Sequence, residues 1–75
     1  MDLILCRMAR AALNWSAQTL AIHAGVSVRT VLRFEAGDTV SLETVEALRS
    51  ALVEGGVLFV EMSGKVGVLV KPHAA

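Results

Sequence analysis

Residues 16–37, SAQTLAIHAGVSVRTVLRFEAG, decide how this chain folds. Within them a small residue, Ala21, is followed four positions later by Gly25 and six positions after that by the β-branched Val31. Two helices that cross at about 90–120° through a short turn need a small side chain where they approach and a glycine where the chain reverses. Val31 then fills the angle between the helices. The spacing therefore predicts two short helices joined by a tight turn.

Capping residues at both ends support these two helices. Ser16 and Ser27 are favourable N-cap residues. Gly25 suits the C-terminal end of the first helix, and Gly37 ends the second. Both caps are expected to be single-sided, because the residues three positions later are not the Glu or Gln of a full capping box: Thr19 and Thr30.

The second of the two helices, about Ser27 to Ala36, has an inward and an outward side. Val31 and Phe34 are spaced at i, i+3 and are expected to face the core. Four positions, two of them arginines, are expected to lie on the outward side: Val28, Arg29, Thr30 and Arg33.

A further helix is predicted on each side of this pair. The first, Leu3–Leu13, places Arg7, Arg10 and Asn14 on one narrow polar stripe at i, i+3 and i+7. The last is capped by Ser41 and stops at a pair of glycines. Two β-rich runs then follow, residues 57–62 and 66–70, joined by Ser63-Gly64-Lys65 as in a hairpin. The predicted fold class is mainly α, with four helices and a C-terminal β-hairpin.

Composition and charge limit the class of protein. The 75 residues suffice for one domain, and 55% of them are hydrophobic, which is more than a small soluble core needs. We therefore expect some apolar surface to meet another chain. The formal net charge is zero, but the part up to Arg33 carries +3 and the part from Phe34 onward carries −3. Such a molecule can turn its basic half toward phosphates.

Several classes of protein are not expected. No apolar run reaches the roughly 18 residues of a membrane span, and residues 1–5 are too short for a signal peptide, so a cytoplasmic protein without membrane contact is predicted. The single cysteine, Cys6, is expected to be a small buried residue. His23 and His73 have no other ligand at metal-binding spacing. Because no nucleophile–base pair or phosphate loop is visible, we expect no enzyme, metal or cofactor.

Five segments share one pattern: Leu13-Asn14-Trp15-Ser16, Leu20-Ala21, Ala24-Gly25-Val26-Ser27, Thr30-Val31 and Phe34-Glu35-Ala36-Gly37. This pattern resembles the XRE family of helix-turn-helix regulators, which includes phage repressor and Cro proteins. The likeness covers roughly residues 4–52. It implies a phage-repressor-like DNA-binding domain of four or five helices, usually dimeric, on a palindromic operator. Because the sequence pattern changes from helical to strand-like near Gly55-Gly56, we assign residues 1–56 to this domain and residues 57–75 to a tail in which the hairpin replaces a fifth helix.

The resemblance also implies roles for single residues. Base edges in the major groove would be contacted by Val28, Arg29 and Arg33, because an arginine can donate two hydrogen bonds to guanine and valine methyls suit thymine. The DNA backbone would be contacted by Gln18, Ser27 and Thr30. Apart from the resemblance, the charge of Arg7 makes it a fourth candidate for a backbone contact. Many relatives have a phosphate-contacting glutamine one position earlier, where this chain has Ala17, so Gln18 would serve instead. For Arg7 the alternative is a side chain that is simply solvated. Arg10 and Glu35 would form an internal ion pair. Trp15 could stack on a base, but beside a cap and a core helix it is expected to pack in the core.

The hairpin is predicted to join two copies of the chain. With a three-residue loop, one of its faces carries only apolar side chains: Leu58, Val60, Met62, Val66, Val68 and Val70. An isolated apolar ribbon is barely stable and has open edges, so pairing with the same ribbon of a second chain would satisfy backbone groups and bury methyls. The alternative is that the hairpin only folds back on the last helix of its own chain.

These features predict a transcriptional regulator of the repressor type, encoded by a bacterium or phage and bound to the nucleoid. It would bind double-stranded DNA as a homodimer on an inverted repeat, with the two recognition helices in successive major grooves about 34 Å apart. The alternative is a protein-interaction module, such as an antitoxin or antiactivator, whose apolar tail binds a partner protein. Zero net charge favours this alternative, whereas Arg29 and Arg33 favour DNA.

Overall fold

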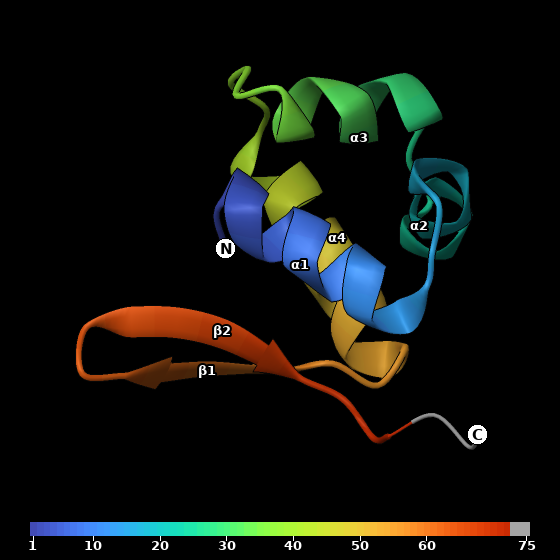
Figure 1. Cartoon of the computed structure of the whole chain (residues 1–75). Coiled ribbons are helices and arrows are strands. Elements are labelled where there is room, and N and C mark those ends of the chain that lie inside the picture. Colours follow the sequence, from blue (N-terminus) through green and yellow to red (C-terminus); the bar gives the residue numbers. More distant parts are fainter. Residues whose placement is uncertain (73–75) are drawn as a thin grey trace.

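The computed structural model describes residues 1–72, which form four helices followed by a hairpin (Figure 1). The elements are α1 (Leu3–Leu13), α2 (Ala17–Ala24), α3 (Val28–Glu35), α4 (Leu42–Glu54), β1 (Leu58–Met62) and β2 (Lys65–Leu69). The predicted mainly α fold is therefore confirmed. Residues 73–75, which include His73 and end the predicted tail at 57–75, lie outside the described part of the chain.

The tight turn between α2 and α3 forms as the spacing of its residues predicts. Ala21 is 3% exposed and Val31 is fully buried, so the two helices meet on these side chains. Gly25 ends α2 at φ 72, in the left-handed region that favours glycine. A Cβ at Gly25 would meet no atom within 4 Å, so the turn needs glycine for its backbone conformation and not for space.

Three helices begin with the same cap. The hydroxyls of Ser16, Ser27 and Ser41 accept the backbone N–H three residues later, at 3.0, 3.1 and 3.1 Å. In each case that later residue is a threonine whose hydroxyl lies 2.8–2.9 Å from the serine hydroxyl. The threonine therefore reaches the side chain of the cap, whereas Glu or Gln of a capping box reaches its backbone N–H.

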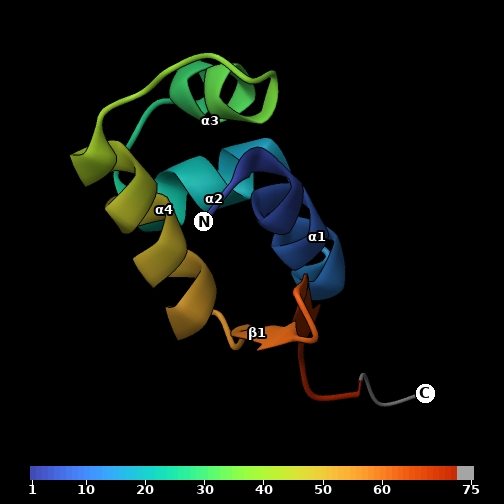
Figure 2. The same cartoon turned by 90° about the vertical axis from the view of Figure 1, so that its left-hand side faces the viewer.

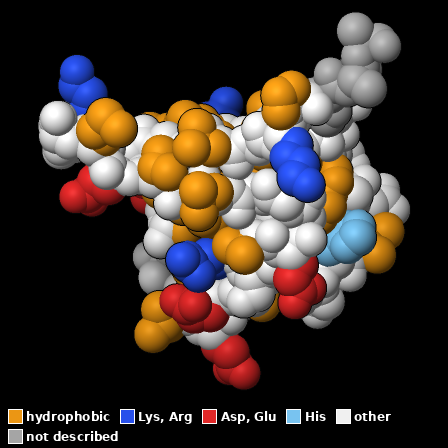
Figure 3. Space-filling view, turned by 90° about the horizontal axis from the view of Figure 1, so that it is seen from below, with side chains coloured by type: hydrophobic (Ala, Val, Ile, Leu, Met, Phe, Trp, Pro, Cys, Tyr) orange, Lys and Arg blue, Asp and Glu red, His pale blue; other side chains and the backbone are white. Residues whose placement is uncertain are grey.

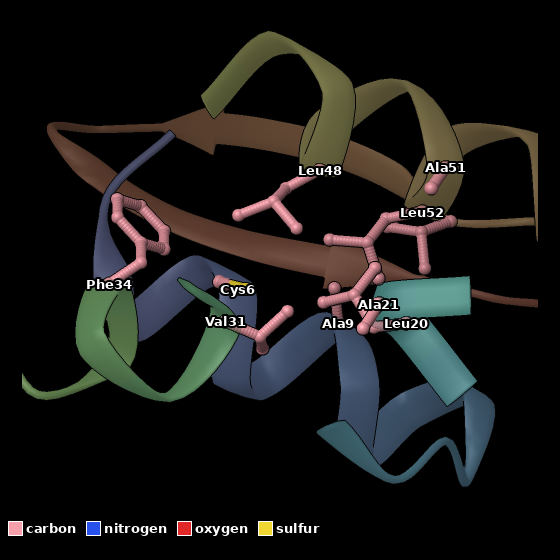
Figure 4. Packing of buried hydrophobic residues seen from close by; sticks show 10 residues of the cluster. Cys6, Ala9, Leu20, Ala21, Val31, Phe34, Leu48, Ala51 and Leu52 are labelled. Atoms are coloured by element: carbon pink, nitrogen blue, oxygen red, sulfur yellow. The ribbon is translucent and has the colours of Figure 1, made fainter. Parts of the chain in front are cut away.

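The core lies where the four helices meet. Figure 4 shows side chains from all four helices pointing into one space, with the hairpin behind them. The largest fully buried side chains are Leu20, Leu48, Leu52, Val31 and Cys6. Trp15 is half-buried against this core and its ring stacks on His23, with centroids 4.4 Å apart and planes at 11°. The expected packing of Cys6 and Trp15 is thus present.

The loop of the hairpin differs from the expectation. Ser63 and Gly64 have φ of 55 and 74, and Met62 pairs directly with Lys65, so the loop has two residues and not three. Because side chains alternate along a strand, this one-residue change turns every side chain of β2 to the opposite face. The predicted all-apolar face is therefore wrong.

The observed register defines two faces. The inner face carries the pairs Phe59↔Val68 and Glu61↔Val66, together with Val57 and Val70. The outer face carries the pairs Leu58↔Leu69, Val60↔Gly67 and Met62↔Lys65. The predicted dimer interface is split, because Leu58, Val60 and Met62 lie on the outer face and Val66, Val68 and Val70 lie on the inner one.

The inner face of the hairpin packs on its own chain. Val57 is buried, and Phe59, Val68 and Val70 pack against the core. β2 contacts α1, and the guanidinium of Arg49 on α4 lies 5.7 Å from the centre of the Phe59 ring. Figures 1 and 2 show α3 on one side of the molecule and the hairpin on the opposite side, with α1 and α4 between them. The fold therefore separates an α3 surface from a hairpin surface.

Candidate nucleic-acid interface

The exposed side of α3 is a strip of two apolar and two basic side chains. Val28 and Leu32 are 41% and 53% exposed, and Arg29 and Arg33 are also exposed. At about 100° per residue these four positions cover one continuous arc of the helix. Val31 and Phe34 lie on the opposite side in the core, so packing fixes which side of α3 faces outward. We call the four outward residues the α3 strip.

Leu32 is the member of the α3 strip that was not predicted from the sequence. It follows Val28 by one helical turn, so the two side chains lie on the same face. The sequence contained a signal for this, because the inward direction of Val31 and Phe34 leaves both positions between them, Leu32 and Arg33, outside.

Asp38 is a second residue that the sequence did not point to. Its carboxylate Oδ2 lies 3.5 Å from Nε of Arg33, and both side chains are more than half exposed. The chain returns toward α3 because Gly37 has φ 95 and the Asp38 N–H donates to the Arg33 carbonyl at 3.0 Å. Since Asp38 contacts Nε only, the two Nη groups of Arg33 have no partner among residues 1–72. They are available to an outside acceptor.

Three of the four expected DNA-backbone residues lie at the starts of α2 and α3. Gln18 is exposed in the first turn of α2, and Ser27 is the exposed N-cap of α3. Thr30, expected outside, is half-buried, and its hydroxyl is paired with that of Ser27 at 2.8 Å. Each hydroxyl carries one proton and the pair uses one, so one proton remains for an outside acceptor.

Arg10 and Glu35 form the expected ion pair between α1 and the end of α3. Arg10 donates from Nε to Glu35 Oε2 at 2.8 Å and from Nη2 to Oε1 at 2.7 Å. Its Nη1 also donates to the Trp15 carbonyl at 3.0 Å, so one guanidinium joins α1, the α1–α2 connection and α3. The side chains of Arg10 and Glu35 are 22% and 8% exposed. This network fixes the position of α3 on the domain.

The surroundings shift the pKa values of the three side chains in this network, Glu35, Arg10 and Cys6. Burial alone would raise the pKa of Glu35, but hydrogen bonds from Arg10 and Cys6, with the charges of Arg10 and Arg7, outweigh it and lower that pKa. The hydrogen bond to Glu35 raises the pKa of Arg10. Burial, and then the hydrogen bond from its thiol to Glu35 at 3.3 Å, raise the pKa of Cys6 to about 12. Cys6 is therefore a neutral donor to the carboxylate.

Arg7 lies one turn before Arg10 on the exposed surface of α1. It lines a shallow groove with Ile4, Met8 and Ala11. The positive charge of Arg7 contributes to lowering the pKa of Glu35, which ends α3. An exposed position on α1 allows both alternatives predicted for Arg7, a phosphate contact and a solvated side chain.

Residues 1–72 contain neither a group of metal ligands nor a helix that could span a membrane. Within this range no three His, Cys, Asp or Glu side chains are grouped as metal ligands. None of the helices in the same range has the length and apolar character needed to cross a membrane.

One comparison with known proteins identifies the chain. A family model described as helix-turn-helix matches residues 7–52, more than half of the chain, and this range contains α2, the turn, α3 and most of α1 and α4. None of the curated proteins matches the sequence.

Proposed function

We propose, from the premise that the chain belongs to the XRE family of helix-turn-helix DNA-binding regulators, that it reads a DNA operator with the α3 strip. The proposed regulator is a homodimer on an inverted repeat, with one α3 in each of two successive major grooves. The observation that supports this best is the position of Arg29 and Arg33 on the outward side of a helix whose inner side is fixed in the core.

Each member of the α3 strip suits a base edge. The free Nη groups of Arg33 can donate two hydrogen bonds to guanine O6 and N7, while Asp38 holds Nε from behind. Arg29 can do the same one helical turn earlier. Val28 and Leu32 offer methyl groups to thymine methyls. A good bidentate contact is worth about 1–3 kcal/mol of discrimination between bases.

The residues around α3 are suited to hold the DNA backbone. Gln18 and the Ser27–Thr30 hydroxyl pair lie where the backbone N–H groups of α2 and α3 point outward, and such helix N-termini attract phosphate. Arg7 adds an exposed positive charge on α1 that acts on Glu35 at the end of α3. The zero net charge of the whole chain does not oppose this contact, because the part up to Arg33 carries +3.

Selection from random-sequence DNA tests this proposal. The full chain and an Arg29→Ala, Arg33→Ala variant are each used to enrich a duplex library, and the bound pools are sequenced. Lys65→Ala, Lys71→Ala serves as the control, because it removes two positive charges from the hairpin on the opposite side of the molecule. We expect an inverted repeat with the wild type and the control, and no enrichment with the α3 variant. An equal enrichment by all three proteins would contradict base reading by α3.

A protein-interaction module is the second candidate, and one observation favours it. The outer face of the hairpin exposes Leu58, Met62 and Leu69 by 60%, 75% and 56%. Figure 3 shows hydrophobic side chains gathered on this side of the molecule. Such a patch can bind a partner protein. Failure of the wild type to enrich any DNA at low salt would favour this candidate over the operator-binding regulator.

A further inference from the structure

We propose that the free edge of β1 pairs with β1 of a second copy, antiparallel and centred on Val60, so that Arg49 of each copy meets Glu61 of the other. This inference rests on the dimer of the proposed function and gives it an interface. The occupant is a second copy of this chain, and the contact joins two hairpins into one four-stranded sheet.

The backbone of β1 has the hydrogen-bonding groups for such a contact. In a hairpin closed by a two-residue loop, the pair next to the loop, Met62↔Lys65, is a hydrogen-bonded pair, and every second pair follows it. Val60 and Leu58 therefore bond to β2, whereas the N–H and C=O groups of Phe59 and Glu61 point to the other edge. Residues 1–72 supply no third strand for that edge. An edge of this kind is a template for another strand.

Charge selects the register. Arg49 lies over the Phe59 ring, and neither Arg49 nor Glu61 has an ion-pair partner within residues 1–72. In a pairing centred on Val60, Phe59 stands opposite Glu61 of the second copy on the inner face, and opposite Cβ atoms are about 4.5–5.5 Å apart. The carboxylate of the second copy then comes beside Arg49, and the symmetry makes this contact twice. A pairing centred on Glu61 would instead oppose two carboxylates, which is unfavourable.

The other edge of the hairpin is less suited to pairing. β2 begins with Lys65 and is followed by Lys71 and Pro72. Lysine on an edge strand opposes the approach of another strand, and proline cannot donate a backbone hydrogen bond. β1 has no lysine or proline, and Glu61 is its only charged residue. The edge of β1 is therefore the one that accepts a second copy.

The position of α3 also favours edge pairing over stacking of the outer faces. The outer face of the hairpin points away from α3 (Figures 1 and 3). Two copies stacked on their outer faces would direct their α3 helices in opposite directions, and both could not enter one duplex. Pairing of β1 edges has its two-fold axis perpendicular to the sheet, so both α3 helices remain on the same side. Of these two arrangements, only the pairing of β1 edges allows adjacent major grooves to be bound together.

Charge exchange tests the interface without DNA. Sedimentation equilibrium of the full chain gives the dimer dissociation constant for the wild type, Arg49→Glu, Glu61→Arg and the variant with both changes. Each single change places two like-charged pairs at the interface and should raise the dissociation constant at least about tenfold, while the double change should restore it to within about threefold. Ser50→Glu, at the exposed neighbouring position of α4, is the matched control and should leave the dimer unchanged.

Amide exchange provides a second readout that needs no variant. As the protein concentration rises and dimers form, the amides of Phe59 and Glu61 should become protected, while those of Val66 and Val68, on the edge of β2, should not. Dimers that are insensitive to both single changes but dissociate with Leu69→Lys, on the outer face, would overturn the proposal in favour of stacked faces. A chain that stays monomeric at high concentration would also overturn it. If such a monomer still enriched a specific DNA sequence, the proposed interface would be wrong while base reading by α3 would stand.

Discussion

Replacing Glu35 by glutamine tests whether the Arg10–Glu35 network fixes α3. The substitution keeps the size of the side chain but removes its charge and one of its two acceptor oxygens. Glu35 accepts three hydrogen bonds, two from Arg10 and one from Cys6, and only 8% of its side chain is exposed. Glutamine therefore leaves Arg10 with an unpaired, half-buried charge and places an amide donor against a guanidinium donor.

The expected loss of unfolding free energy is about 2–3 kcal/mol. A hydrogen bond to a charged group contributes about 1.5–3 kcal/mol, and removing one partner of a buried ion pair costs about 3–5 kcal/mol. The pair here is only partly buried, so we take the lower end of these ranges. A domain of this size has a total stability of about 4–11 kcal/mol, so Glu35→Gln should lower Tm by about 10–20 °C.

Urea unfolding at fixed protein concentration, followed by circular dichroism and by the fluorescence of Trp15, measures this loss. Glu54→Gln, an exposed glutamate at the end of α4, is the matched control and should change stability by less than about 0.5 kcal/mol. Because the folded-state pKa of Glu35 lies below its ordinary value of 4.5, its contribution is present above pH 4.5 and is lost as the pH falls through the folded pKa. The difference between wild type and Glu35→Gln should therefore shrink in acid. A loss at pH 7 no larger than the limit given for the control, about 0.5 kcal/mol, would show that the Arg10–Glu35 pair does not stabilise the fold.

Further substitutions and the alkylation of one thiol test the packing of the domain. Gly55→Ala should destabilise the fold by about 1–3 kcal/mol, because the new Cβ would lie 2.6 Å from the Trp15 ring, and a stabilised variant in urea unfolding would contradict this contact. The thiol of Cys6, whose pKa is raised to about 12 by burial, should react with iodoacetamide at pH 8 at least ~100-fold more slowly in the native protein than in urea, and equal rates would show that it is not buried. For the same reason stability should decline as the pH rises above the ordinary thiol pKa of 9.0, and Cys6→Ala should remove this decline. Val68→Lys, on the inner face, should lower the stability of the single chain by about 1–3 kcal/mol. Leu69→Lys, on the outer face, should change it by less than about 0.5 kcal/mol. Equal effects of the two substitutions in thermal unfolding would contradict the observed register.

The helices could be predicted because their signals are local. The serine caps, Gly25 and the inward spacing of Val31 and Phe34 act within a few residues of one another, and the structure places each where its spacing requires. The Arg10–Glu35 pair joins residues far apart in the sequence, and only the family resemblance pointed to it. The contact of Asp38 with Arg33 depends on the turn at Gly37 and had no such precedent.

The faces of the hairpin could not be predicted because they depend on the backbone of one residue. Ser63 adopts φ 55, which is uncommon for a residue other than glycine, and this makes a two-residue loop possible. With Lys65 counted in the loop, every side chain of β2 is assigned to the wrong face. Which face is then covered depends on α1 and α4, and no pattern within residues 57–70 contains that information.

Whether Arg33 reads a base can be measured by comparing the wild type with Arg33→Ala on duplexes that carry single-base substitutions. Binding of the wild type and Arg33→Ala to the selected operator, and to duplexes with each half-site position changed in turn, is measured at one salt concentration by fluorescence anisotropy. We predict that Arg33→Ala weakens operator binding by about 1–3 kcal/mol and removes discrimination at one guanine position while preserving it at the others. An equal loss of affinity for every sequence, with discrimination intact at all positions, would show that Arg33 contacts only phosphate and would contradict base reading by this residue.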